Sequence, residues 1–223
     1  MDRGLGMAGR RRRWRWIMGI GGAVIAVASG FQLARKYFEE PEYEVVREDG
    51  DFEVRRYGPR VIAETFVSVE DRRAATSVGF SRLAEYIFGG NEKIAMTTPV
   101  EATPGDEDGE RIAMTTPVEA EPSEAGWRVV FTMPSERHLA DLPRPRDPRV
   151  ILRETPGRTV ATMRFSGFMN DRLRRENERA LRERLAAEGL RPTSPVTVAI
   201  YDPPSVVLPF FRRNEVMVEV EAL

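Results

Sequence analysis

The residue types that usually carry catalysis or bind metals are scarce in this sequence. It contains one histidine, His138, and no cysteine among its 223 residues. This excludes disulfides, thiolate metal sites and Cys-His catalysis, and it leaves almost no material for Ser-His catalysis or a multi-histidine metal site. The common nucleophile, phosphate-binding and zinc-binding motifs are absent from the sequence as well. We therefore expect a binding protein and not an enzyme, although Glu64, Glu85 or Glu101 could act as a general acid or base in a cleft.

His138 is the candidate metal ligand, because a neutral imidazole is a common ligand of transition metals. It lies in the polar segment SERHL at 135–139, which follows a predicted strand. The alternative is an exposed surface histidine without a ligand. The sequence leaves both interpretations open.

A nine-residue sequence, IAMTTPVEA, occurs twice, at 94–102 and at 112–120. Its threonines and apolar residues predict a strand, and the Gly- and Asp-rich spacer between the copies predicts a loop, so we expect two neighbouring strands. Met96 and Met114 occupy equivalent positions in the two copies. Each methionine could ligate a metal or line an adaptable apolar pocket, or it could simply pack in the core.

Arg82 and the pair Phe210 and Phe211 are further candidates for contact with a ligand. Arg82 lies on a helix predicted over 71–88, where its guanidinium could bind a ligand carboxylate through two hydrogen bonds. In so arginine-rich a chain it could instead belong to a solvated helix face. Phe210 and Phe211 could form an aromatic rim that stacks on a flat ligand, or they could pack against the second predicted helix.

The first 36 residues differ from the rest of the chain. Five arginines between 10 and 15 precede an apolar run at 17–34, which as a helix is just long enough to span a bilayer. We predict a membrane anchor at 1–36 with the arginines in the cytoplasm, which places the following domain on the extracytoplasmic side of the cell membrane. The alternative is a signal peptide cleaved at an A-x-A site at 26–28, followed by export.

The predicted main domain spans 43–223, after a linker at 37–42. The charge of the chain is balanced, with 34 basic and 35 acidic residues, so we expect no nucleic-acid partner. Helices are predicted at 71–88 and from Asn170 or Asp171 to 187, each with a capping residue before it and glycine after it. Both halves show the order strand, strand, helix, strand, strand, which indicates one α+β domain with an internal pseudo-repeat. Strands are predicted at 43–45, 52–54, 61–69, 127–133, 150–153, 158–165, 196–201 and 215–220.

Several short segments identify a family. They are KIAMTTPV at 93–100, VFTMPS at 130–135, RFSG at 164–167, and YDPP at 201–204 with RRNEV at 212–216. In this order and spacing they resemble the SOUL haem-binding protein family, over about residues 43–222. The resemblance implies a twisted antiparallel β-barrel of about eight strands flanked by two helices. The barrel is built from two pseudo-symmetric ββαββ halves, as in gyrase-inhibitory-protein-like domains, and here it follows the N-terminal hydrophobic helix.

The resemblance also implies a function. It points to non-covalent binding of haem or a related tetrapyrrole in a hydrophobic surface cleft, without catalysis. The candidate contacts are then His138 for the iron and Arg82, Met96, Met114, Phe210 and Phe211 for the rest of the ligand. Arg213, Asn214 and Glu215 match the family's ending, and for them we expect a buried structural clasp. Two alternatives remain: a regulatory or scavenging module for another flat amphipathic molecule, and a small hydrolase of such molecules.

Overall fold

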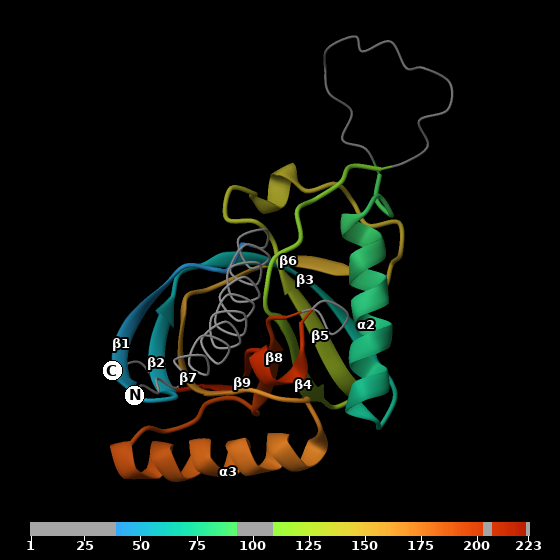
Figure 1. Cartoon of the computed structure of the whole chain (residues 1–223). Coiled ribbons are helices and arrows are strands. Elements are labelled where there is room, and N and C mark those ends of the chain that lie inside the picture. The colour runs from blue at the N-terminus through green and yellow to red at the C-terminus, as the bar shows by residue number, and fades with distance from the viewer. Residues whose placement is uncertain (1–38, 93–108, 203–206, 222–223) are drawn as a thin grey trace, which may run out of the picture. The chain divides into compact units, whose positions relative to one another are not determined.

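The computed structural model describes residues 39–92, 109–202 and 207–221, which form one nine-stranded antiparallel sheet with two helices (Figure 1). The predicted α+β class is confirmed, with nine strands in a curled sheet whose edges are its first and sixth strands. The strands are β1 (Tyr43–Asp49), β2 (Phe52–Tyr57), β3 (Arg60–Val67), β4 (Val118–Ser123), β5 (Gly126–Thr132), β6 (Ile151–Thr155), β7 (Arg158–Phe165), β8 (Thr197–Ile200) and β9 (Asn214–Glu219). The helices are α2 (Arg72–Ile87) and α3 (Asp171–Glu188), with short 3₁₀ turns η1 (Leu139–Asp141) and η2 (Pro209–Phe211).

The sheet order shows how the two halves are joined. Strands lie in the order β1-β2-β7-β9-β8-β4-β5-β3-β6, and β4 pairs with β8 where the halves meet. On each side of this junction the order is the same: β8-β9-β7 in one half and β4-β5-β3 in the other. One ββαββ half contains β2, β3, α2, β4 and β5, and the other contains β6, β7, α3, β8 and β9. The first strand of each half pairs with the second strand of the other half, because β2 pairs with β7 and β6 with β3. The two predicted ββαββ halves are therefore present, with their first strands exchanged.

Both helices begin where the sequence predicts. The Asp71 side chain accepts a hydrogen bond from the Ala74 amide at 2.7 Å, and the Asn170 side chain accepts one from the Leu173 amide at 2.9 Å. Helix α3 ends at Gly189, whose φ of 69° is the left-handed conformation that glycine adopts without strain.

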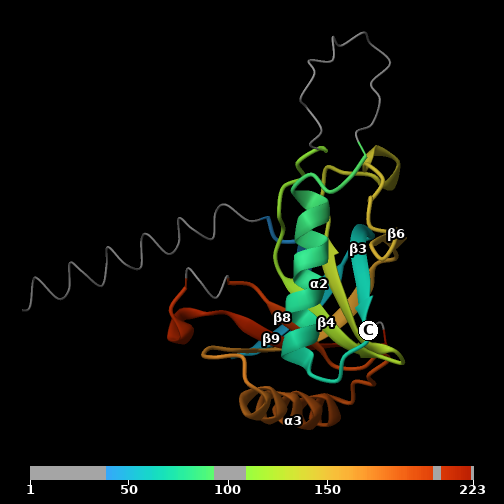
Figure 2. The same cartoon turned by 90° about the vertical axis from the view of Figure 1, so that its right-hand side faces the viewer.

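The two helices cover the same face of the sheet (Figures 1 and 2). Helix α2 packs Leu83 and Ile87 into a core with Val129 and Phe131 of β5. Helix α3 packs Leu181 and Leu185 into a separate core, which contains residues of β2, β7 and β9. The opposite face of the sheet, called the inner face below, carries polar residues such as Arg55, Glu119 and Glu215.

The strand prediction for the repeated sequence is wrong for most of its second copy. Only 118–120 of the copy at 112–120 belong to a strand, namely β4. Pro117 precedes this strand and lacks the amide that a ladder requires, so regular pairing begins after it. The first copy, at 94–102, lies outside the described residues, as do the proposed anchor at 1–36 and Met96. Among the helices that the structure describes, none is long and apolar enough to cross a membrane.

Candidate functional site

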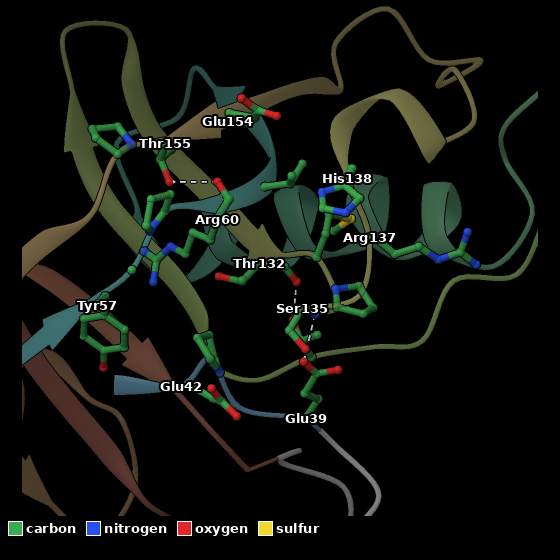
Figure 3. Close-up of a pocket in the computed structure, with 18 residues that line it drawn as sticks. Glu39, Glu42, Tyr57, Arg60, Thr132, Ser135, Arg137, His138, Glu154 and Thr155 are labelled. Atoms are coloured by element: carbon green, nitrogen blue, oxygen red, sulfur yellow. Dashed lines mark hydrogen bonds between the residues drawn. The ribbon is translucent and has the colours of Figure 1, made fainter. Parts of the chain in front are cut away.

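A cavity of about 680 Å³ opens where the β2–β3 turn meets the β6–β7 turn (Figure 3). These turns are equivalent in the two halves and touch because the first strands are exchanged. Their approach is close, since a Cβ on Gly157 would lie 2.8 Å from the Tyr57 carbonyl oxygen. The volume falls in the range of about 300–1,000 Å³ that is usual for small-molecule sites. The lining comes from 39, 41–42, 57–61, 115, 132–135, 137–138 and 154–156.

The walls of this cavity are apolar in part and stiff. The apolar lining residues are Pro41, Pro59, Val61, Met133, Pro134 and Pro156. Four of these residues are prolines, and proline has a fixed φ angle. The segments that carry them therefore lose little conformational freedom when a ligand binds. The Met133 amide donates to the Val61 carbonyl oxygen at 2.9 Å, which ties the ends of β5 and β3 together. The wall is therefore largely preformed.

His138 lines this cavity, on the opposite side from Arg60 and Tyr57 (Figure 3). It precedes η1, and its carbonyl oxygen accepts from the Asp141 amide at 3.0 Å, which fixes the backbone there. The imidazole is exposed and has no hydrogen-bond partner among the residues the structure describes. Arg137 extends away from the cavity and donates to Glu110 at 2.5 Å. The imidazole is thus available to a ligand.

Arg60 is the buried cation of the cavity. Its side chain is 12% exposed, and Nη2 donates to Glu119 Oε1 at 3.2 Å. Burial lowers the pKa of Arg60, and attraction to Glu119 only partly compensates. Glu119 itself is bound more tightly by Arg158, whose Nη2 lies 2.7 and 2.8 Å from its two oxygens. Arg60 therefore has a poorly neutralised charge.

The rim of the cavity is acidic. Glu39 accepts a hydrogen bond from the Ser135 amide at 2.8 Å, which closes the lower edge (Figure 3). Glu42 and Glu154 are exposed and form no ion pair with the described residues. The rim thus favours neutral or cationic groups, whereas the interior offers a cation.

The inner face of the sheet carries a network of buried ion pairs beside a small apolar cluster, which contains Tyr57, Val160, Ala199, Tyr201 and Met217. Glu64 binds Arg128 at 2.5 Å and Arg153 at 2.8 Å, and Glu215 binds Arg55 and Arg213. Burial alone would raise the pKa of Glu64, but hydrogen bonds from these two arginines outweigh it and the pKa is lowered. The predicted clasp of Arg213 and Glu215 is present on this face, and Asn214 donates to the Gly167 carbonyl oxygen at 3.1 Å.

The structure does not bring the predicted site residues together. Of those it describes, His138 alone lines the cavity. Met114 packs against the core beneath α2, and Arg82 donates to the Phe66 carbonyl oxygen at 3.0 Å. Phe210 and Phe211 are 64% and 45% exposed on η2, with ring centroids 4.7 Å apart.

Sequence reasoning missed Arg60, Tyr57 and Thr132. The available signal was the pair of turns, Tyr-Gly-Pro at 57–59 and Thr-Pro-Gly at 155–157, which hold similar positions in the two halves. Nothing in the sequence shows that these turns meet, because that depends on the exchange of strands.

Comparison with known proteins gives consistent results. A family model described as SOUL heme-binding protein matches residues 38–219. Heme-binding protein 2 of Mus musculus is 30% identical over 173 residues, which cover 74% of this chain and 77% of that protein. Heme-binding protein 2 of Homo sapiens is 31% identical over 145 residues, covering 63% and 64%. The solved C-terminal domain of EcmrR has a TM-score of 0.54 at 13% identity, over 81% of this chain and 99% of that one, and this likeness shows the fold alone.

Proposed function

This chain belongs to the SOUL haem-binding protein family, and from that premise we propose that it binds haem or a related tetrapyrrole non-covalently in the cavity of Figure 3. The observation that carries the proposal is a preformed, partly apolar cavity with an unpartnered imidazole at its edge. Proline, valine and methionine walls suit the faces of a flat apolar ring.

The cavity residues fit a haem group in three respects. The apolar wall would enclose part of the macrocycle, His138 would hold the iron, and the Arg60 cation would face a carboxylate. When bound, the iron supplies a coordination position that a neutral imidazole can fill. The protein's own contribution is to exclude water from the ring and to fix its orientation.

We propose binding without catalysis. A general acid at neutral pH needs a carboxyl group whose pKa is raised. For the buried Glu64, Glu119 and Glu215, burial would raise the pKa, but paired arginines outweigh it and the pKa of each is lowered. These groups remain ionised, and this argues against the hydrolase alternative.

A second candidate ligand is favoured by the acidic rim. Glu42 and Glu154 would repel the two carboxylates of haem and would attract a flat amphipathic molecule with a neutral or cationic edge. Such a ligand would use the same apolar wall. It would make the protein a regulatory or scavenging module.

The test is a titration of haemin into residues 37–223. The described fold supports this choice, because 38–223 form one compact unit that contains every core cluster. We expect a shifted Soret band that saturates near one equivalent. A non-saturating or absent shift, together with saturable binding of a flat cationic dye, would favour the second candidate.

We also propose that residues 1–36 anchor the chain in the cell membrane, with the domain on the extracytoplasmic side. The support is the arginine cluster followed by the apolar run at 17–34. Carbonate extraction of membranes from cells that express the full chain tests this proposal. A protein that stays in the pellet supports the anchor, whereas a soluble product lacking the first 28 residues or so supports a cleaved signal peptide.

A further inference from the structure

The interior of the cavity holds a polar pair that the fold itself leaves incompletely satisfied. Arg60 and Thr132 both line it, from the adjacent strands β3 and β5. Ile62 is the cross-strand partner of Thr132, and Arg60 precedes Ile62 by two residues. Residues two apart on a strand share a face, so Arg60 and Thr132 are diagonal neighbours, which long side chains can bridge. Figure 3 shows both side chains in the same region of the cavity.

Arg60 has hydrogen-bonding capacity to spare. A guanidinium has five N–H donors, and within the described chain the side chain of Arg60 donates to Glu119 alone, at 3.2 Å. The Tyr57 ring lies 5.4 Å from its guanidinium carbon, a cation–π distance that limits its movement. A guanidinium that is held in place and has unused N–H donors can bind an anion through charge-assisted hydrogen bonds.

Thr132 supplies an independent observation. This residue is 4% exposed, and its hydroxyl oxygen is buried without a hydrogen-bond partner among the described residues. The backbone is satisfied separately, because the Thr132 carbonyl oxygen accepts from the Thr115 hydroxyl. An unpaired buried hydroxyl destabilises the folded state unless a ligand satisfies it.

We propose that Arg60 and Thr132 form a carboxylate-binding subsite inside the cavity, which holds one carboxylate of an amphipathic ligand. The subsite rests on the proposed use of this cavity for ligand binding and names the group that enters it. The carboxylate accepts hydrogen bonds from the Arg60 guanidinium and from the Thr132 hydroxyl. Glu42 and Glu154 at the rim repel this carboxylate only weakly, because they are exposed. Solvent and salt screen their charges more than they screen the charge of the buried Arg60.

The experiment compares acids with their neutral derivatives on residues 37–223. The probes are haemin and haemin dimethyl ester, followed by absorbance, and 1-pyrenebutyrate and its amide, followed by fluorescence. We expect Arg60→Gln to weaken binding of both acids by about tenfold, the loss of one charge-assisted contact, and to leave the ester and the amide within about twofold. Arg60→Lys keeps the positive charge but loses the paired N–H donors of the guanidinium, so the affinity of this variant for the acids should be intermediate. Arg172→Gln removes an 85% exposed arginine on α3 and should change none of the affinities.

Thr132→Val separates binding from folding. The change removes the unpartnered hydroxyl at nearly constant shape, so the melting temperature should stay the same or rise, while the acids should bind about threefold more weakly. The fold should survive Arg60→Gln because Glu119 keeps two hydrogen bonds from Arg158.

The outcomes separate the subsite from the proposed function. If haemin binds but acid and ester respond equally to Arg60→Gln, the subsite is overturned and haem binding stands. If pyrenebutyrate binds with the expected dependence and haemin does not bind, the subsite stands and haem binding fails. If neither acid saturates on the unmodified protein, both are overturned.

Discussion

Arg55 on β2 and Glu215 on β9 form a two-point ion pair across the intervening strand β7, although both side chains are buried. Arg55 Nη1 lies 2.7 Å from Glu215 Oε2, and Nη2 lies 2.9 Å from Oε1. The Tyr201 hydroxyl donates to Oε2 at 2.8 Å, and Arg213 Nε donates to Oε1 at 2.9 Å. The carboxylate thus receives four hydrogen bonds, which offset much of the cost of its burial.

Glu215→Gln should lower the free energy of unfolding by about 3 kcal/mol, because it removes the buried counter-ion that Arg55 and Arg213 share and leaves them only Glu53 and Glu40, which are partly exposed. Urea denaturation of residues 37–223 measures the change. The matched control is Arg56→Gln, which breaks an exposed pair with Glu44 and should cost about 0–1 kcal/mol. Equal effects of the two substitutions would show that the buried pair adds nothing beyond surface pairing.

Stability should fall at acid pH because of Glu64, Glu119 and Glu215. Paired arginines hold the pKa of each in the folded state below the ordinary value of 4.5. These groups therefore stabilise the fold fully above pH 4.5, and this contribution is lost as the pH falls through the lowered values. The urea midpoint should be flat above about pH 5.5 and should decline below about pH 4.5. In Glu215→Gln the decline should be shallower, and an unchanged slope would contradict this assignment.

Gly79→Ala should destabilise the domain by about 1–3 kcal/mol, although alanine is the better helix former. A Cβ at Gly79 would lie 2.5 Å from Val129 Cγ2, so α2 would have to move away from β5. Ser81→Ala, at an exposed position of the same helix, should be nearly neutral. Thermal melts compare the two. The contact is confirmed if Val129→Ala costs less in the Gly79→Ala background than alone.

His138→Ala should weaken haemin binding by about tenfold and change the Soret spectrum, because it removes the proposed iron ligand. Metal-free protoporphyrin should bind unchanged. Glu136→Gln, in the same loop but outside the cavity lining, serves as the control. An unaltered haemin spectrum would show that His138 does not ligate the iron.

Neutralising the acidic rim should strengthen the binding of ligands that carry carboxylates. Glu42→Gln and Glu154→Gln should each raise haemin affinity by about twofold at low salt, since exposed charges interact weakly. The gain should disappear at high ionic strength. A loss of affinity in either variant would show that the rim contacts the ligand directly.

The elements of this fold follow from local sequence signals, but the site does not. Asp71, Asn170 and Gly189 mark the helix ends by capping chemistry, which acts within a few residues. In the second repeat the composition predicts a longer strand than the structure contains, because β4 begins only after Pro117. The cavity depends on which turns meet, and this is set by strand pairing between distant parts of the chain. Arg60 therefore resembles any other arginine in the sequence, while Arg82, Phe210 and Phe211 carry suitable chemistry but do not line this cavity.

The exchange of β2 and β6 between the halves has a consequence for the origin of the architecture. In a chain of half this length, the first strand would find no pairing partner within its own copy. It would have to pair with the second strand of another copy, as β2 pairs with β7 and β6 with β3. Two such copies would complete each other in a two-fold symmetric homodimer. Gene duplication and fusion of that ancestor would yield the present topology, and would place the cavity at the former subunit boundary.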